Sequence, residues 1–272
     1  MSIPDIILAD QHKIPQIGLG LWQVKDQNEF DQAFTAAIKA GYRHFDCAQE
    51  YYNEQMLGNA WQASGKKRSE LFLTTKISIR NFQYKKAHSS FEDSLDKLQT
   101  DYVDLLLLHF PVTILRKKAW KAVEEIQKAG GARTIGVSNY TIRHLEEMRN
   151  YARVMPVVNQ VELHVFLQQP ELVKYCRDHN IAIEAYSPIA HARAMDNQVI
   201  NDIAKKHSKT YAQIMLRWCI EQDFVVLPKS VHLNRIQENI KIFDFKLDEQ
   251  DLAELAKQDR NLRTAWSPVH VP

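Results

Sequence analysis

Short apolar runs alternate with amphipathic segments along nearly the whole chain. Residues 103–109 are the clearest run, an almost unbroken apolar stretch that ends in a polar residue and is typical of a strand buried on both faces. Residues 26–41 show the other pattern, with apolar side chains at helical spacing, an N-cap residue in Asp26 and a closing glycine in Gly41. The repetition of these two patterns predicts a series of strand–helix units.

The series predicts one closed barrel. We expect strands at residues 16–19, 44–46, 71–76, 103–109, 134–138, 157–162, 182–186 and 224–228. We expect helices at residues 26–41, 54–64, 91–98, 117–128, 141–149, 171–180, 199–206 and 211–221, and from about residue 234 onward. Because buried, parallel-type strands favour closure over an open sheet, the predicted fold is α/β, a (β/α)8 TIM barrel forming a single domain over residues 1–272. An N-terminal β-hairpin at residues 6–14 and extra C-terminal helical structure at residues 252–256 complete the prediction.

Composition narrows the class of protein. Hydrophobic residues at 45% and charged residues at 25% are expected of a soluble globular protein with one large core. Because 35 basic and 33 acidic residues give a formal net charge of only +2, we expect neither a nucleic-acid nor a membrane partner. The first residues lack a signal-peptide pattern and no apolar run is long enough to span a bilayer, so we expect a cytoplasmic location. The cysteines Cys47, Cys176 and Cys219 form no CxxC pair, so we expect no metal site and no disulfide framework.

Polar side chains stand at the carboxyl ends of most of the predicted strands. In a barrel of this type the chemistry takes place at that end, while apolar layers fill the interior. The strand-end residues, together with one loop tyrosine, are Asp46, Tyr51, Lys76, His109, Ser138, Asn139, Gln160, Tyr186, Ser187, Lys229 and Ser230. Packing alone does not account for so many polar groups, so we expect them to converge on one rim.

Four of these residues predict a proton-donating site. A buried lysine is costly unless it is paired, and Asp46 on the neighbouring strand is the natural partner of Lys76. An ammonium group close to Tyr51 stabilises the phenolate, so we expect it to lower the pKa of this tyrosine towards the range of a general acid. His109 can hydrogen-bond a substrate oxygen. Such a site protonates an oxygen while a cofactor supplies a hydride, and no G-x-G-x-x-G motif is present to bind that cofactor in the Rossmann manner.

Seven segments, all in the same order, resemble the aldo-keto reductase family. Residues 41–54, GYRHFDCAQEYYNE, are similar to the family signature G-Y-R-x-x-D-[TS]-A-x-x-Y-x-N-E. The other segments are TTK at 74–76, LLHFP at 107–111, IGVSN at 135–139, NQVE at 159–162, AYSP at 185–188, and PKS at 228–230 followed by Arg235, Glu238 and Asn239. They span nearly the whole chain, and the resemblance is to the short bacterial-type branch that includes 2,5-diketo-D-gluconic acid and methylglyoxal reductases.

The resemblance implies a monomeric, NADPH-dependent reductase of aldehydes or ketones, with small or sugar-derived carbonyls as substrates. It implies that Tyr51 is the proton donor, that Lys76 and Asp46 tune it, and that His109 orients the carbonyl. The implied cofactor-binding residues are Ser138, Asn139 and Gln160 at the carboxamide, Tyr186 on the nicotinamide ring, Ser187 by the pyrophosphate, Lys229, Ser230 and Arg235 at the 2′-phosphate, and Glu238 and Asn239 at the adenine. Lys229 and Arg235 suit a phosphate dianion because it prefers charge-assisted donors, and residue 235 lies near a predicted helix N-terminus.

The chain departs from the family pattern in three places. Cys47 stands where threonine or serine is usual, and Phe110 replaces the usual tryptophan after the histidine. The stretch between Pro111 and Trp120 is short, which indicates a trimmed lid and an open pocket. The aromatic candidates for the substrate pocket are Trp22, Tyr52, Phe82 and Phe110, with His191 and Trp266 in late loops.

Other interpretations remain open at this stage. Asp46 and Lys76 could form only a structural ion pair, and Ser138 and Asn139 could cap the following helix. Cys47 could be redox-sensitive or an inert buried thiol. A regulatory or redox-sensing barrel that binds NADPH with little turnover would carry the same fold. A Schiff-base aldolase using Lys76 would need a lysine without a carboxylate partner.

Overall fold

The computed structural model describes residues 3–112, 114–190 and 195–272, and its centre is an eight-stranded parallel sheet. In spatial order the strands are β3 (Gly18–Gly20), β4 (His44–Asp46), β5 (Phe72–Ile77), β6 (Val103–Leu108), β7 (Ala132–Ser138), β8 (Val158–Glu162), β9 (Ala182–Tyr186) and β10 (Val225–Leu227). Isolated parallel bridges join Ile17 to Val226 and Gly20 to Lys229, so the first strand meets the last and the sheet closes. The predicted TIM barrel is confirmed.

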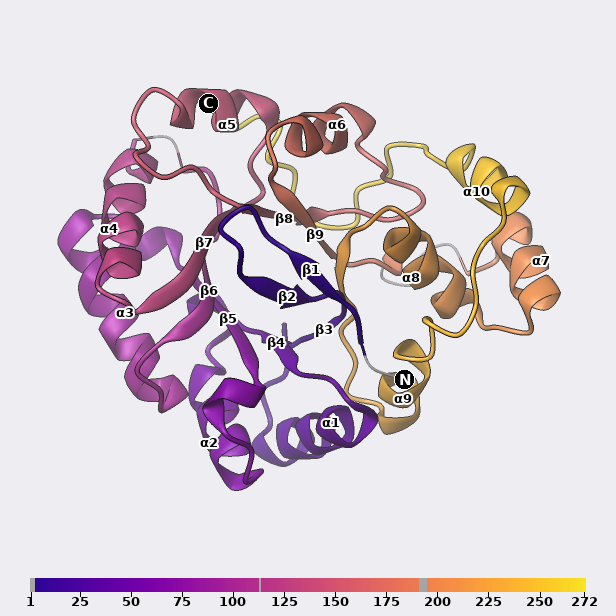
Figure 1. Ribbon diagram of the computed structural model, residues 1–272, viewed down its shortest axis with the longest axis horizontal. Helices are drawn as coiled ribbons and strands as arrows, with labels where there is room; N and C mark the ends of the chain where they lie inside the picture. Colours follow the sequence, from indigo (N-terminus) through magenta and orange to yellow (C-terminus); the bar gives the residue numbers. More distant parts are fainter. Residues whose placement is uncertain (1–2, 113, 191–194) are drawn as a thin grey trace.

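Helices surround this barrel (Figure 1). They are α1 (Gln27–Ala40), α2 (Glu54–Ala63), α3 (Tyr84–Leu98), α4 (Arg116–Lys128), α5 (Ile142–Met148), α6 (Pro170–Asp178), α7 (Gln198–His207), α8 (Tyr211–Glu221), α9 (Leu233–Asn239) and α10 (Glu249–Ala256). Asp26 caps α1 and Gly41 ends it in the left-handed conformation, as expected. The helix expected around residues 91–98 forms the second half of α3, and the first turns of α3 bury only Ala87 and therefore lack a visible apolar stripe.

The N-terminal hairpin closes one end of the barrel. Its strands β1 (Asp5–Ile7) and β2 (Lys13–Pro15) pair in antiparallel fashion and lie across the barrel axis in Figure 1. Buried Leu8 and Ile14 belong to a separate apolar cluster that includes the first residues of three strands, Phe72, Val158 and Val225. The hairpin therefore covers the amino ends of the strands, and the carboxyl ends are left for chemistry.

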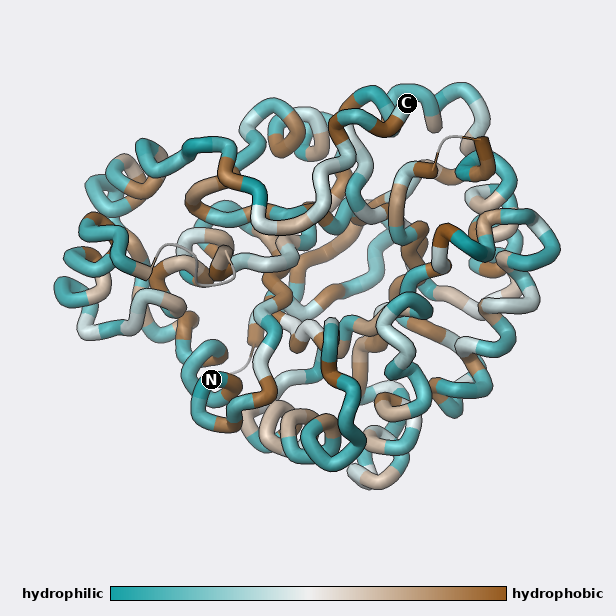
Figure 2. Tube along the Cα trace, turned by 180° about the vertical axis from the view of Figure 1, so that it is seen from behind, coloured by the Kyte–Doolittle hydropathy of each residue, from teal (hydrophilic) through white to brown (hydrophobic). Residues whose placement is uncertain are grey.

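Hydropathy follows this architecture. Seen from the opposite side in Figure 2, apolar residues concentrate on the barrel wall and hydrophilic residues prevail on the outer turns of the helices. Across the described ranges, no helix combines the length and the apolar character needed to cross a membrane.

The C-terminal segment after α10 is fastened to the carboxyl end of the barrel. Glu162, the last residue of β8, accepts hydrogen bonds from the backbone N–H and the hydroxyl of Thr264, both at 2.6 Å, and from the N–H of Ala265 at 3.2 Å. Further along, Arg116 donates to the carbonyl of Pro272 at 2.6 Å. Sequence periodicity predicts no place for this irregular segment, and these polar contacts determine where it lies.

Gly58 marks a close approach of α2 to α3, which predicts a stability effect. A Cβ at this position would lie 2.1 Å from the carbonyl oxygen of Lys97 and 3.1 Å from the carbonyl carbon of Leu98. We expect Gly58→Ala to lower the free energy of unfolding by about 2 kcal/mol or more, because the backbone clash outweighs the gain of about 1 kcal/mol in helix propensity. Urea unfolding measures the change, and exposed Gln55→Ala on the same helix should shift it by less than about 0.5 kcal/mol. An alanine variant as stable as the wild type would contradict the close approach.

The Glu162 contacts predict a pH dependence of stability. Burial alone raises the pKa of Glu162, but hydrogen bonds from His164, Thr264 and Ala265 outweigh it and lower the pKa from 4.5 to about 2. A lowered pKa contributes stability above pH 4.5 that is lost as the pH falls towards 2, about 3 kcal/mol at most. We therefore expect wild type to lose more stability than Glu162→Gln between pH 5 and pH 3 in urea titrations. Equal losses in the two proteins would show that the carboxylate does not stabilise the segment.

Candidate active site

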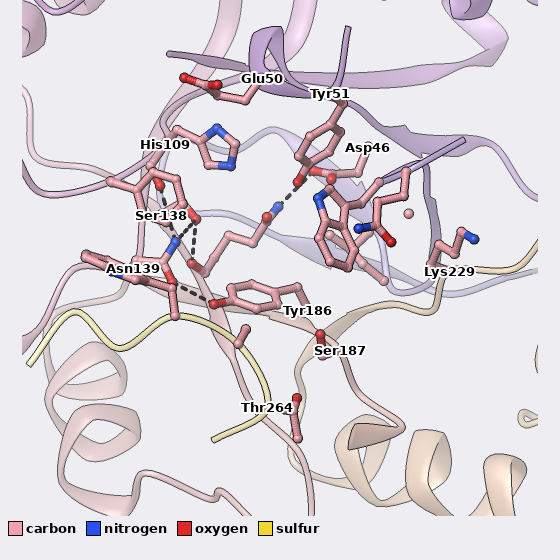
Figure 3. Close-up of a pocket in the computed structure, with 18 of the residues that line it drawn as sticks. Asp46, Glu50, Tyr51, His109, Ser138, Asn139, Tyr186, Ser187, Lys229 and Thr264 are labelled. Atoms are coloured by element: carbon pink, nitrogen blue, oxygen red, sulfur yellow. Dashed lines mark hydrogen bonds between the residues drawn. The ribbon is translucent and has the colours of Figure 1, made fainter. Parts of the chain in front are cut away.

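A cavity of about 690 Å³ lies at the carboxyl end of the barrel (Figure 3). It brings together most of the strand-end residues singled out from the sequence. Those that line it are Asp46, Tyr51, His109, Ser138, Asn139, Gln160, Tyr186, Ser187 and Lys229, together with the aromatic residues Trp22 and Phe110. The prediction that these groups converge on one rim is confirmed.

Lys76 lies behind the cavity wall and connects Asp46 with Tyr51. Its side chain is fully buried, and its Nζ donates to Asp46 Oδ1 at 2.6 Å and to the Cys47 carbonyl at 3.1 Å. The third contact of Nζ, at 3.4 Å, is the hydroxyl of Tyr51, which lies beside Asp46 at the cavity in Figure 3. Because Lys76 has a carboxylate partner, the Schiff-base alternative loses its basis.

The side chain of Gln49 holds the turn that carries Tyr51. This turn, the 3-10 helix η1 (Gln49–Tyr51), follows β4 directly. Gln49 Oε1 accepts from the N–H of Ser78 at 2.8 Å and from Asn81 Nδ2 at 3.0 Å. Gln49 Nε2 donates to the carbonyl of Ser90 in α3 at 2.9 Å. The phenol is therefore placed by a turn fixed to two neighbouring segments.

Burial and charge act in opposite directions on the phenol. Burial raises the pKa of Tyr51 to about 12, although the Lys76 ammonium lowers it and Asp46 raises it further. Burial disfavours the Lys76 ammonium, yet Asp46 and Tyr51 outweigh burial and raise the pKa of Lys76 above its ordinary value. The expected net lowering for Tyr51 is wrong, because sequence reasoning weighed the neighbouring charge but not desolvation. At neutral pH the phenol keeps its proton. The charge of Lys76 keeps the pKa of Tyr51 lower than burial alone would make it.

His109 faces the phenol across the cavity. The two rings meet edge to face with centroids 5.6 Å apart, and Phe110 stacks on the imidazole at 4.5 Å. Burial, followed by the charge of Lys76, lowers the pKa of His109 well below its ordinary value. The imidazole is therefore neutral at physiological pH. Its ring N–H can donate a hydrogen bond to an oxygen, but the ring carries no extra, acidic proton to transfer.

Asn139 joins the wall on the opposite side of the cavity. Its Nδ2 donates to the His109 carbonyl at 3.2 Å and to Ser138 Oγ at 3.0 Å, and its Oδ1 accepts from the Tyr186 hydroxyl at 2.8 Å. Helix α5 has Thr141 as its N-cap, so the alternative that Ser138 and Asn139 cap this helix is wrong. These contacts hold Tyr186 with its ring along the cavity, as Figure 3 shows.

The predicted adenosine-binding residues lie apart from the cavity lining. Arg235 is exposed on α9, and Ser230 is buried with its Oγ accepting from the N–H of His232 at 3.1 Å. Glu238 accepts from the Thr210 hydroxyl at 2.7 Å, and Asn239 is buried. Lys229, which lines the cavity, is the link between this region and the rim.

Two of the aromatic candidates for the substrate pocket are corrected by the structure. Tyr52 is 74% exposed, its backbone is left-handed at φ 57°, and its hydroxyl accepts from Arg80. Phe82 is fully buried in the apolar core. Neither side chain belongs to the cavity lining. His191 lies outside the described residues.

Other cavity residues were not singled out from the sequence. They are Gly20, Gln23, Glu50, Ile79, Arg80, Pro188, Ile189, Leu227, Pro228, Thr264 and Ala265, and Trp266 was only a late-loop candidate. Glu50 could have been found as the neighbour of Tyr51 in the signature; its Oε1 accepts a hydrogen bond from Ser78 Oγ. Thr264 to Trp266 carried no signal, because the C-terminal segment has no periodicity. Trp266 places its edge against Phe110, with ring centroids 5.0 Å apart.

Metal and thiol chemistry receive no support from this geometry. No group of three or more potential metal-ligating side chains occurs in the part of the chain that the structure describes. Cys47 is fully buried, and burial raises the pKa of its thiol well above the ordinary value. A thiol of this kind is poorly reactive, which favours the inert interpretation.

Comparison with known proteins gives a consistent result. Residues 16–260 match the model of the Aldo/keto reductase family. Glyoxal reductase of Bacillus subtilis is 41% identical over 268 residues, covering 98% of this chain and 97% of the relative. Methylglyoxal reductase DkgA of Escherichia coli strain K12 is 41% identical over 273 residues, covering 98% of each chain. The Bombyx mori aldo-keto reductase solved in complex with NADP is 32% identical, with a TM-score of 0.92 over 97% of this chain and 95% of that one. This chain belongs to the aldo/keto reductase family.

Proposed function

We propose that this chain reduces small aldehydes and ketones with NADPH and that Tyr51 donates the proton. The observation that carries the proposal is a buried chain of hydrogen bonds, from Asp46 to Lys76 and from Lys76 to the Tyr51 hydroxyl. Tyr51 lines the cavity, and so does His109. The relatives named as glyoxal and methylglyoxal reductases support a small carbonyl substrate.

The donor groups of the cavity suit a nicotinamide nucleotide. Ser138, Asn139 and Gln160 offer hydroxyl and amide groups for a carboxamide, and the Tyr186 ring offers an aromatic surface. Ser187 would lie by the pyrophosphate. We propose that the ammonium of Lys229, which lines the cavity, binds a phosphate, and that Ser230, Arg235, Glu238 and Asn239 continue the site beyond the cavity towards the adenosine. When bound, NADPH supplies the hydride that the carbonyl carbon receives.

The protein's own part in the reaction is to move one proton. Tyr51 donates its phenolic proton to the carbonyl oxygen, and neutral His109 hydrogen-bonds the same oxygen and orients it. The phenolate left behind is stabilised by the Lys76 ammonium, which Asp46 holds in place. Solvent restores the proton after the alcohol leaves.

We also propose a domain organisation, an oligomeric state and a cellular location for this activity. A barrel that closes between β3 and β10 supports one domain over residues 1–272. We propose a monomer acting in the cytoplasm, in keeping with the balanced charge of the chain.

Tyr51→Phe tests the proton donor. We expect this variant to bind NADPH with unchanged affinity and to lose at least about 100-fold in kcat, because general acid catalysis contributes about that much. Methylglyoxal reduction is followed by the loss of reduced-nicotinamide absorbance, and NADPH binding by fluorescence. Tyr52→Phe is the matched control, since this adjacent tyrosine is exposed and should keep full activity. Full turnover in Tyr51→Phe would remove the phenol from the mechanism.

A double variant separates catalysis from a purely structural ion pair. Lys76→Met leaves Asp46 buried without its cation, so we expect it to lose about 3 kcal/mol or more of stability and most activity. Adding Asp46→Asn removes the unpaired charge and should recover much of the stability, while kcat stays at least about 100-fold below wild type. Urea unfolding and NADPH turnover measure the two effects. Activity that returns together with stability would show that the pair is only structural.

A further inference from the structure

A buried carboxyl group lies behind the cavity, next to the site described above. Glu184 is fully buried on β9 and is the direct register partner of Gln160 on β8. Glu184 Oε2 accepts from Gln160 Nε2 at 2.6 Å, and Asp46 Oδ2 accepts from the same nitrogen at 2.8 Å. Gln160 is thus held between the two carboxyl groups.

The two contacts fix the orientation of the Gln160 amide. A primary amide nitrogen carries two protons, and here each has its own carboxyl acceptor. Gln160 also lines the cavity, so its Oε1 is the end of the amide left for a ligand. An acceptor at this position selects a ligand group that carries N–H donors and disfavours one that offers only acceptors.

We propose that Glu184 is a positioning residue that, with Asp46, orients the Gln160 amide so that its oxygen receives the N–H of a primary carboxamide on the cofactor. The inference rests on the proposed function, because the carboxamide is that of the nicotinamide. Glu184 itself touches neither substrate nor cofactor and acts through Gln160.

The charges around Glu184 are compatible with this role. The groups that face it are His44 and Asp46 on β4 and Lys76 on β5, with His44 Nε2 at 3.5 Å from Oε1. Burial, with a further contribution from Asp46, raises the pKa of Glu184 to about 8, and burial lowers the pKa of His44 to about 3. A protonated carboxyl still has a carbonyl oxygen to accept from Gln160, and it adds no second negative charge beside Asp46.

The test compares two cofactors that differ only in the donor group. In the 3-acetylpyridine analogue of NADP⁺ a methyl ketone replaces the carboxamide, so the N–H donors are lost. Dissociation constants are measured by quenching of tryptophan fluorescence, since Trp22 and Trp266 line the cavity. We expect wild type to prefer NADP⁺ by about tenfold, the size of one hydrogen bond, and Gln160→Met to show no preference.

Glu184→Met removes the acceptor at similar volume and should reduce the preference by about fivefold or more. Glu184→Gln keeps a carbonyl oxygen for Gln160 and should retain the wild-type preference. The matched control is Glu54→Met, which removes another buried carboxyl, one that accepts from Thr75 at 2.6 Å, and should leave the preference unchanged. If Glu184→Met does not fold, Glu184→Ala, which makes smaller demands on packing, replaces it.

A wild-type preference in folded Glu184→Met or Glu184→Ala overturns the inference. The outcome is distinguishable from failure of the proposed function, because methylglyoxal turnover by wild type is measured separately. Absent turnover would remove the reductase proposal, whereas the binding preference would still decide the role of Glu184.

Discussion

The structure of the site depends on one requirement, that the ammonium of Lys76 be paired inside a barrel from which water is excluded. An unpaired cation at this depth would be strongly destabilising. Asp46 on the adjacent strand pairs with it, with 2.6 Å between Lys76 Nζ and Asp46 Oδ1. The same contact fixes the direction of the lysine side chain, so that its remaining hydrogen-bonding capacity reaches the hydroxyl of Tyr51. Stability and acid strength are therefore coupled in a single pair.

Sequence patterning was sufficient for the barrel because its strands are buried on both faces. Such strands have apolar runs in the sequence, and the polar residue that ends each run lies at the carboxyl end of the barrel, where the active site forms. Asp46 and His109 line one cavity at this end, and Lys76 lies directly behind its wall, bonded to Asp46. Sequence patterning predicts this arrangement because strand direction, and not side-chain detail, decides which residues meet.

What the sequence could not supply was the balance of competing forces and the direction of individual side chains. The pKa of Tyr51 is raised because desolvation outweighs the effect of the neighbouring ammonium. The sequence motifs do not reveal how deeply the phenol is buried, so they cannot predict this balance. Tyr51 and Tyr52 are consecutive and chemically alike, yet Tyr51 lines the cavity, whereas Tyr52 has a left-handed backbone and is 74% exposed. Glu184 belongs to no motif in the sequence, and its contact with Gln160 depends on the pairing of two strands that are separated along the chain.

The fastening of the C-terminal segment has a consequence for how such barrels diversify. Glu162 accepts hydrogen bonds from Thr264 and Ala265. The next residue, Trp266, packs against the ring of Phe110, which itself stacks on His109. Part of the cavity wall is thus formed by the last part of the polypeptide, outside the strands that carry the proton chemistry. Substitutions in this segment change the cavity wall without moving Asp46 and Lys76, which the barrel strands hold in place.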